Sequence, residues 1–328
     1  MFLWPAAILY RLGLTLDKLL SKRRPPLGIP LICIGNAVAG GAGKTPTTLA
    51  IAALLKEQGY NVHIVTKGYG GRIKEATQVS VTSHTPRDVG DEAFLMATYG
   101  WPVWVGRHRY ALAKRAQDAG AHVVLFDDGL QDWPMPYDIR ILVVDAHYGF
   151  GNGHLLPMGP LRESIPHVLQ RVNMLCILHG YGVDLQRKPG EHSLPFAKGY
   201  SGHWIHTSRQ ITLPPALKKG DPVVAFAGIG NPEQFRQSIL NAELDLRGFH
   251  IFPDHHFYSE KEIATLQGAA TQQGCPLLTT EKDFVRLSLL PKTMLNQIHC
   301  LSLTIPIQAA DLDKLKDLIK KTFDSKER

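Results

Sequence analysis

Hydrophobic residues along this chain fall into short runs that alternate with segments of helical spacing. Each run is bounded by glycine, proline or polar residues and has the length of a buried strand. The strands predicted in this way cover residues 27–36, 61–66, 122–126, 139–145 and 172–178. Residues 47–58 and 109–119 have the spacing of helices, and Gly59 closes the first of them. Strands that alternate with helices form a parallel sheet covered on both faces, so we expect an α/β fold with a doubly wound, mostly parallel sheet.

The same alternation starts again after a loop-rich region at residues 150–215. A strand is predicted at 221–228, a helix at 232–241 and a further extended segment at 247–258. We therefore expect a second, smaller α/β domain, followed by an amphipathic C-terminal helix. The expected division is an N-terminal helix at 1–26, a larger domain at 27–214, the smaller α/β domain at 215–310 and the C-terminal helix at 311–328.

The first 26 residues combine hydrophobic and basic character in the pattern of an amphipathic helix. Leu9, Leu12 and Leu16 share one face, whereas Arg11 and Lys18 lie on another. A helix of this kind lies in a membrane interface, with its apolar side among acyl chains and its cations facing anionic lipid headgroups. The alternative is a helix packed on the protein's own core. We favour the membrane-interface helix, and we expect no segment long enough to span a bilayer.

The charge balance indicates an anionic partner without identifying it. Lysine and arginine outnumber aspartate and glutamate by 36 to 29, which leaves a formal net charge of +7. A basic balance of this size suits an acidic lipid, a phosphorylated substrate or nucleic acid. Basic patches interleaved with aromatic residues are lacking, so we expect no nucleic-acid partner. The four cysteines lie far apart and form no C-x-x-C pair, so neither a zinc knuckle nor a disulfide framework is indicated.

Residues 38–45, VAGGAGKT, have the pattern of a phosphate-binding loop after the first predicted strand. Glycines let backbone N–H groups point at phosphates, the lysine binds the β and γ phosphates, and the following hydroxyl binds Mg²⁺. We expect nucleotide contacts from Val38, Ala39, Gly40, Gly41, Ala42, Gly43, Lys44 and Thr45. The strict G-x-x-x-x-G-K-[ST] pattern fails at Val38, but strand, glycine turn and helix occur in the required order. The larger domain is therefore predicted to be a P-loop NTPase-like nucleotide-binding domain.

A carboxylate at the end of a neighbouring strand is the second requirement of a P-loop enzyme. The segment HVVLFDDGLQ supplies Asp127 and Asp128 directly after a predicted strand. Successive strand residues face opposite ways, so we expect one of the two to approach Mg²⁺ and favour Asp127, together with Thr45. Asp128 and Gln131 are additional candidates for the site. No N/T-K-x-D segment for reading guanine fits, so we expect ATP as the nucleotide.

Several segments, taken in order, resemble the tetraacyldisaccharide 4′-kinases, which act in lipid A biosynthesis in Gram-negative bacteria. The matching segments are GNAVAGGAGKTP (35–46), KGYGGR (67–72), VGDEA (89–93), DDGLQ (127–131), LPMGPLRE (156–163), AGIGNP (227–232), FPDHHFY (252–258) and TTEKD (279–283). Each segment alone is weak evidence, but the ordered set covers most of the chain. The loop of this family also lacks the first glycine, which accounts for Val38.

The resemblance implies an enzyme that transfers the γ-phosphoryl group of ATP to the 4′-hydroxyl of an acylated glucosamine disaccharide 1-phosphate, forming lipid IVA. It also implies Mg²⁺ as a cofactor and a peripheral location at the cytoplasmic face of the inner membrane. In the family, an aspartate of the GDE segment and a histidine of the DHH segment activate the acceptor hydroxyl, which corresponds to Asp91 and His255 as catalytic residues here. Glu92 corresponds to the metal-associated acid of the family.

The residues alone leave several of these assignments open. Asp91 opens a predicted helix, so an N-cap role is the alternative. Adjacent side chains of an extended segment diverge, so His255 and His256 are not expected to bind one metal ion together, and the choice of His255 rests on the resemblance. Asp254 is expected to orient the imidazole. Among the basic residues, Arg162 is the preferred phosphate contact because guanidinium pairs well with phosphate.

Two other classes of protein fit the phosphate-binding loop taken alone. An ATP-driven switch or chaperone would hydrolyse ATP without a lipid acceptor, but it gives no reason for the DHH segment. A nucleic-acid-binding ATPase is compatible with the charge of +7 and would bind RNA or DNA with a steep dependence on salt.

Overall fold

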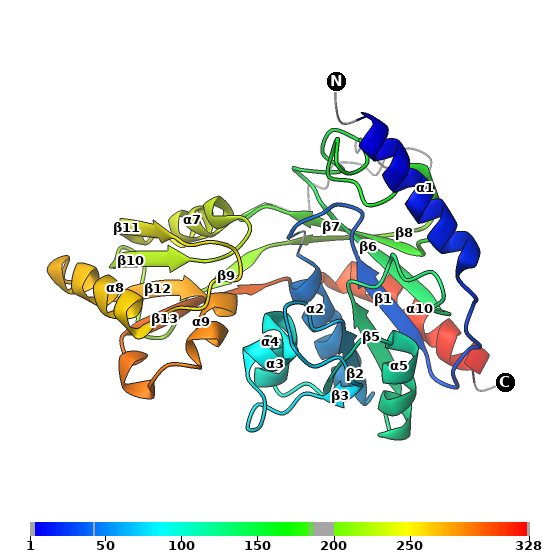
Figure 1. Cartoon of the computed structure of the whole chain (residues 1–328), viewed down its shortest axis with the longest axis horizontal. Helices are drawn as coiled ribbons and strands as arrows, with labels where there is room; N and C mark the ends of the chain where they lie inside the picture. The colour runs from blue at the N-terminus through cyan, green and yellow to red at the C-terminus, as the bar shows by residue number, and fades with distance from the viewer. Residues whose placement is uncertain (1–3, 42, 184, 186–199, 327–328) are drawn as a thin grey trace.

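Two β-sheets, each covered by helices, make up the computed structural model of this protein and lie side by side in Figure 1. The structure describes residues 4–41, 43–183, 185 and 200–326 of the 328-residue chain. Within these residues the larger sheet has eight strands in the order β3-β4-β2-β5-β1-β6-β7-β8. The smaller sheet has five, in the order β11-β10-β12-β13-β9.

The larger sheet is parallel except at one edge, where β3 pairs antiparallel with β4. Its strands are β1 (Leu31–Gly35), β2 (Val62–Thr66), β3 (Thr77–Gln78), β4 (Val103–Val105), β5 (Val123–Asp127), β6 (Ile139–Asp145), β7 (Met174–His179) and β8 (His203–Ser208). One face packs against α2 (Lys44–Glu57), α4 (Asp91–Thr98) and α10 (Ala309–Lys326). The other face packs against α5 (Arg109–Asp118) and α6 (Ile165–Leu169). Both faces are thus buried, which explains the continuous hydrophobic runs and confirms the predicted doubly wound, mostly parallel sheet.

The smaller sheet is also mostly parallel and covered by helices on both faces. Its strands are β9 (Gln210–Thr212), β10 (Pro222–Ala227), β11 (Asp245–Ile251), β12 (Leu277–Thr280) and β13 (Ile298–Thr304), and only β9 runs antiparallel to its neighbour. The helix α7 (Pro232–Asn241) packs on one face, and α8 (Glu260–Gln272) and the 3₁₀ turn η4 (Lys292–Met294) lie on the other. The second α/β unit predicted from the sequence is therefore present.

The chain passes from the larger sheet to the smaller one between β8 and β9 and returns after β13 (Figure 1). On its return it forms α10, whose Leu315 and Ile319 are buried against the larger sheet. The C-terminal helix thus belongs to the cover of the larger sheet. The strand β9 lies just before the boundary expected at residues 214–215 and is already part of the smaller sheet.

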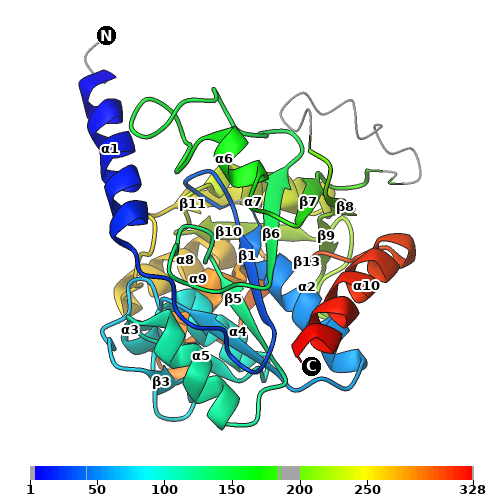
Figure 2. The same cartoon turned by 90° about the vertical axis from the view of Figure 1, so that its right-hand side faces the viewer.

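The N-terminal helix α1 (Trp4–Leu20) lies at the outer side of the larger sheet, and its first turn projects beyond the body (Figure 2). None of its described residues is buried, and Leu9, Leu12, Leu16 and Leu19 are 53–75% exposed. Polar contacts hold the helix in place: Tyr10 donates to the carbonyl of Arg162, and Lys18 contacts His167. The alternative of a helix packed on the core by its leucine face is therefore wrong. In the described part of the chain, every helix is too short or too polar to cross a membrane.

The carboxyl ends of the central strands carry the polar segments that the sequence singled out. In the larger sheet, β1 leads into the phosphate-binding loop and β5 ends at Asp127. In the smaller sheet, β10 leads into Gly228, and β12 leads into α9 (Glu281–Leu287). The helix α9 packs against α4, which follows the short helix α3 (Pro86–Val89), so the two sheets meet beside these strand ends.

Candidate active site

The phosphate-binding loop turns sharply out of β1 and into α2. Gly40 and Gly43 have φ values of 113° and 80°, a region that favours glycine, and a Cβ at Gly43 would collide with the side chain of Leu178. Lys44 is the first residue of α2, and its Nζ donates to Asn36 Oδ1 at 3.1 Å. Ala42 lies outside the described residues. The loop therefore places a lysine at a helix N-terminus, as phosphate binding requires.

Val38 departs from the strict loop pattern because it has a packing role. Its side chain is buried in the core of the larger sheet, and its backbone forms a bridge with Leu161. Beside it, Ala39 N donates to Pro160 O at 2.7 Å. The first position of the loop is thus held against the GPLRE segment, and a valine there packs better than glycine would.

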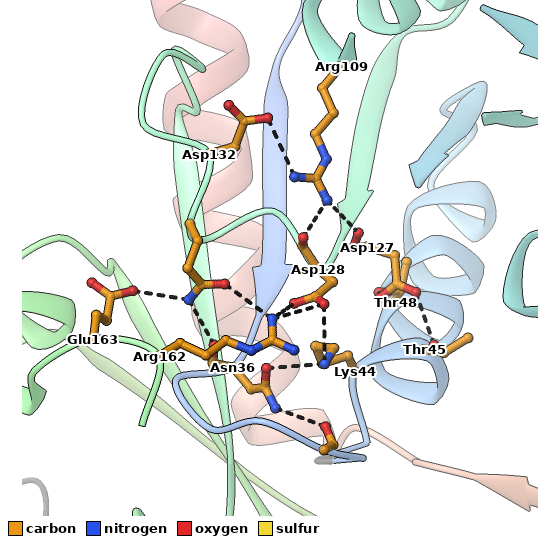
Figure 3. Close-up of polar contacts among 12 residues, drawn as sticks. Asn36, Lys44, Thr45, Thr48, Arg109, Asp127, Asp128, Asp132, Arg162 and Glu163 are labelled. Atoms are coloured by element: carbon orange, nitrogen blue, oxygen red, sulfur yellow. Dashed lines mark hydrogen bonds and ion pairs between the residues drawn. The ribbon is translucent and has the colours of Figure 1, made fainter. Parts of the chain in front are cut away.

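Asp127 lies beside the hydroxyl that follows the loop lysine (Figure 3). Its Oδ2 accepts from Thr45 Oγ1 at 3.0 Å and its Oδ1 from Thr48 Oγ1 at 3.2 Å. Burial and the neighbouring carboxylate of Asp128 raise the pKa of Asp127 to about 6. A bound cation would favour its ionised form. The hydroxyl and carboxylate oxygens are the hard donors that Mg²⁺ takes from a protein when phosphates and water complete its shell, so the pair fits the predicted metal site.

The side chain of Asp128 points toward Lys44 of the phosphate-binding loop and toward Arg162. Its φ is 59°, and its carboxylate contacts Lys44 Nζ at 3.6 Å and Arg162 Nη1 at 3.0 Å (Figure 3). Burial alone would raise the pKa of Asp128, but Lys44 and then Arg162 outweigh burial and lower this pKa. The two neighbouring aspartates therefore have different partners, as expected, but the reason differs: Asp128 lies beyond the end of β5, and its left-handed backbone sets the direction of its side chain.

Arg162 and Gln131 belong to a network behind the loop. Arg162 Nη1 donates to Gln131 Oε1 at 3.3 Å, and Gln131 Nε2 donates to Glu163 Oε1 at 3.1 Å. Glu163 is 2% exposed and is also paired with Arg171 at 2.5 Å. Arg162 is the residue of this network that reaches the loop through Asp128. The sequence did not predict Glu163 as a residue of the site; its position beside Arg162 in the GPLRE segment was the one signal that could have indicated it.

Arg109 stabilises the turn at the end of β5. Its side chain is buried and donates to the backbone carbonyls of Asp127 and Asp128, and it pairs with Asp132 at 3.4 Å. These bonds hold the turn that orients both carboxylates.

Asp91 and His255 come together although 164 residues separate them in the chain. Asp91 is the first residue of α4 and is 2% exposed, and its Oδ2 lies 2.8 Å from His255 Nδ1. Gly90 is the N-cap of this helix, so the alternative of Asp91 as an N-cap is wrong. The hydrogen bond to Asp91 raises the pKa of His255, although burial acts in the opposite direction. The imidazole is therefore oriented by a buried carboxylate through Nδ1, and Nε2 is the ring atom that remains for a substrate.

The next histidine turns away from this pair. His256 Nε2 contacts Glu262 Oε1 at 3.1 Å, and its ring stacks on Phe252. Asp254 Oδ1 accepts from the backbone N–H of His255 at 3.0 Å, while its Oδ2 is 3.9 Å from His255 Nε2. His255 therefore lies beside Asp91, whereas His256 contacts residues of the smaller α/β unit.

Glu92 follows Asp91 and pairs with Lys282 of α9 at 2.7 Å. Burial would raise the pKa of Glu92, but Lys282 outweighs it and lowers this pKa. After burial, the charge of Glu92 is one of the effects that raise the pKa of Asp127, and the charge of Lys282 is one of those that lower the pKa of Lys44. Glu92 and Lys282 therefore lie near the phosphate-binding loop. Among the described residues, no group of three or more His, Cys, Asp or Glu is arranged to hold a metal ion by itself.

Comparisons with known proteins agree over nearly the whole chain. The family model described as tetraacyldisaccharide-1-P 4′-kinase matches residues 1–324. The tetraacyldisaccharide 4′-kinase of Nitrobacter hamburgensis is 39% identical over 287 residues, which cover 87% of this chain and 83% of that protein. That of Dinoroseobacter shibae is 38% identical over 317 residues, covering 94% and 90%. The crystal structure of LpxK from Aquifex aeolicus in complex with ATP superposes with a TM-score of 0.77 at 26% identity, covering 98% of both chains.

Proposed function

Because this chain belongs to the tetraacyldisaccharide-1-P 4′-kinase family, we infer that it transfers the γ-phosphoryl group of ATP to the 4′-hydroxyl of tetraacyldisaccharide 1-phosphate, forming lipid IVA in lipid A biosynthesis. One observation carries the inference. A phosphate-binding loop lies at the strand ends of one sheet, an imidazole oriented by the buried carboxylate of Asp91 follows a strand of the other, and the two sheets meet beside these strand ends. A donor site and an acceptor site are the two parts that a kinase needs.

The donor side consists of the loop, Thr45 and Asp127. ATP would lie with its phosphates along residues 38–45, where Lys44 binds the β and γ phosphates. Thr45 and Asp127 would hold Mg²⁺, whose charge neutralises phosphate oxygens during transfer. Glu92 is the third proposed metal-associated residue, and it would reach the metal once Lys282 releases it. Two further cations of the site, Lys282 and Arg162, are paired with carboxylates that a phosphate can replace.

The acceptor side consists of His255 and Asp91. A sugar hydroxyl is a weak nucleophile, so a base that removes its proton as the bond to phosphorus forms accelerates transfer. His255 Nε2 takes that proton, and Asp91 fixes the ring through Nδ1 and stabilises the resulting imidazolium. Asp254 holds the backbone of His255 in place.

The reaction is tested with purified protein, Mg-ATP and the acylated disaccharide 1-phosphate. We expect stoichiometric formation of the 4′-phosphorylated lipid, and loss of turnover when EDTA removes Mg²⁺, with recovery on adding Mg²⁺ back. An ATP-driven switch would instead hydrolyse ATP at an undiminished rate without lipid. That outcome, with no phosphorylated lipid, would refute the assignment.

The exposed face of α1 supports a peripheral position at the inner membrane, on its cytoplasmic face where ATP is present. Its leucines face solvent, while Tyr10 and Lys18 dock the helix beside the GPLRE segment that contacts the phosphate-binding loop. A helix immersed by this face would therefore bring the active site to the lipid surface, where the acylated substrate lies. The cations Lys22, Arg23 and Arg24 follow the helix and suit anionic headgroups.

Replacing the four exposed leucines with serine is expected to detach the protein from membranes. Each leucine contributes about 1.5–3 kcal/mol when fully buried, so the variant Leu9→Ser, Leu12→Ser, Leu16→Ser, Leu19→Ser should bind anionic vesicles at least about tenfold more weakly. Sedimentation with vesicles measures the change. The matched control is the variant Leu240→Ser, Ile251→Ser. These residues lie on α7 and β11 and are 46% and 62% exposed, and the variant should bind vesicles normally. Equal binding of the leucine variant and the parent protein would assign membrane attachment to another surface.

A further inference from the structure

Asp91 is held by a second residue besides His255. Its Oδ2 accepts a hydrogen bond from Arg286 Nε at 2.7 Å, and the side chain of Arg286 is completely buried. A buried carboxylate needs a strong partner because removal from water favours its neutral form. Arg286 provides this partner from α9, on the smaller sheet, whereas Asp91 opens α4 beside the larger sheet.

The two donors to Asp91 are connected through the carbonyl group of Gly228. His255 N donates to Gly228 O at 3.0 Å, and Arg286 Nη1 donates to the same oxygen at 2.6 Å. Asp91, His255, Gly228 and Arg286 therefore close a ring of hydrogen bonds. The backbone of His255 is in the left-handed region with φ of 59°, which a residue with a side chain seldom adopts. The bond to Gly228 holds that conformation, and Arg286 holds Gly228.

Asp283 holds a different nitrogen of Arg286 from the one that contacts Asp91. Its Oδ1 accepts from Arg286 Nη1 at 2.8 Å, from Tyr258 OH at 2.8 Å and from Gly228 N at 3.1 Å. Asp283 and Arg286 both have fully buried side chains. A buried network with several directed bonds has one favoured arrangement, so the guanidinium has little freedom at Asp91.

We propose that Arg286 is a positioning residue for phosphoryl transfer: it bridges the Asp91 carboxylate and the Gly228 carbonyl, and thereby keeps Asp91 Oδ2 directed at His255 Nδ1. It acts through Asp91 and touches no substrate. The guanidinium comes from one sheet and the carboxylate from the other, so the base is assembled only when α4 and α9 are packed together. The inference rests on the proposed role of Asp91 and His255 in activating the acceptor hydroxyl.

The test compares full-length variants in the lipid phosphorylation assay with Mg-ATP. We expect Arg286→Met to lower kcat about 100-fold, within the range that a positioned base contributes, while KM for ATP stays nearly constant. Arg286→Lys keeps a cation that reaches Asp91, and it should restore kcat to within about tenfold of the parent protein. The matched control is Thr279→Val, which removes a buried hydrogen bond to the carbonyl of Phe226 between β12 and β10 and should keep normal kcat despite a lower Tm.

A double-mutant cycle with Asp91→Asn separates positioning from a general loss of stability. If Arg286 acts through Asp91, the double variant should be no more than about threefold slower than Asp91→Asn alone, because the position to be fixed is already lost. Additive effects would overturn the proposal, as would normal kcat in Arg286→Met. If the methionine variant does not fold, Arg286→Gln replaces it in the same cycle, since glutamine keeps a buried donor without the charge. Normal turnover in Asp91→Asn would instead refute the proposed role of Asp91 and His255, and a parent protein that forms no phosphorylated lipid would refute the proposed function, so these failures are distinct.

Discussion

Lys44→Ala is expected to lower kcat/KM for phosphoryl transfer by about 10³-fold or more, the size of effect that removal of a cation from a transferred phosphate produces. Lys44 Nζ lies 3.1 Å from Asn36 Oδ1 and 3.6 Å from Asp128 at the N-terminus of α2. Burial lowers the pKa of Lys44, and Asp128 offsets part of this effect. Alanine would leave the negative charge that develops on the phosphate without its nearest protein cation. Initial rates over a range of ATP concentrations measure the loss.

Lys56→Ala is the matched control for this variant. Lys56 lies in the last turn of the same helix and stacks over the ring of Trp101 at 5.2 Å, far from the loop. It changes the net charge by the same amount, so kcat/KM should remain within about twofold of the parent value, as is usual for a surface substitution. A Lys44→Ala protein with near-normal kcat/KM would show that the loop does not bind the transferred phosphate.

The larger sheet was predictable because its strands are buried on both faces. β1, β2, β5, β6 and β7 are hydrophobic runs with glycine, proline or polar residues at their ends, so periodicity and length identify them. Shorter strands carry too few residues for this signal, so the two-residue β3 and the three-residue β4 were not predicted, nor was the three-residue β9 of the smaller sheet. β8 was also missed, since its sequence HWIHTS is polar in composition although five of its six positions are buried.

The candidate site shows a similar division. Sequence spacing alone locates Lys44, Thr45 and Asp127, because these residues lie at the carboxyl ends of β1 and β5, which are neighbours in the larger sheet. The pairing of Asp91 with His255 depends on how two sheets meet, and only the resemblance indicated it beforehand. Arg286 carried no signal, since an arginine in the last turn of a short amphipathic helix is usually a surface charge. Its function follows from burial and contacts that arise in the folded chain.

Asp91→Asn is expected to lower kcat by about 10²- to 10⁴-fold, which is the contribution of a correctly oriented general base. The amide is similar in shape to the carboxylate and can keep its oxygen facing both His255 Nδ1 and Arg286 Nε, but it is neutral and cannot stabilise an imidazolium. His255→Asn should have an effect of similar size. The double variant should be no slower than the slower single variant, because the two residues act as one unit.

The pH dependence of kcat/KM distinguishes this role from a structural one. A base works in its neutral form, so the rate should fall as the pH drops through the pKa of His255, which the bond to Asp91 raises above its ordinary value. Asp91→Asn replaces the charged acceptor by a neutral one, while burial continues to lower the pKa of His255 and the charges of Asp254 and Glu92 continue to raise it. The acid limb should therefore move to lower pH even though the maximum rate falls. The control His256→Asn removes the contact with Glu262 and the stacking on Phe252, and it should leave the limb in place. An acid limb that stays unchanged in Asp91→Asn would mean that a group other than His255 accepts the hydroxyl proton.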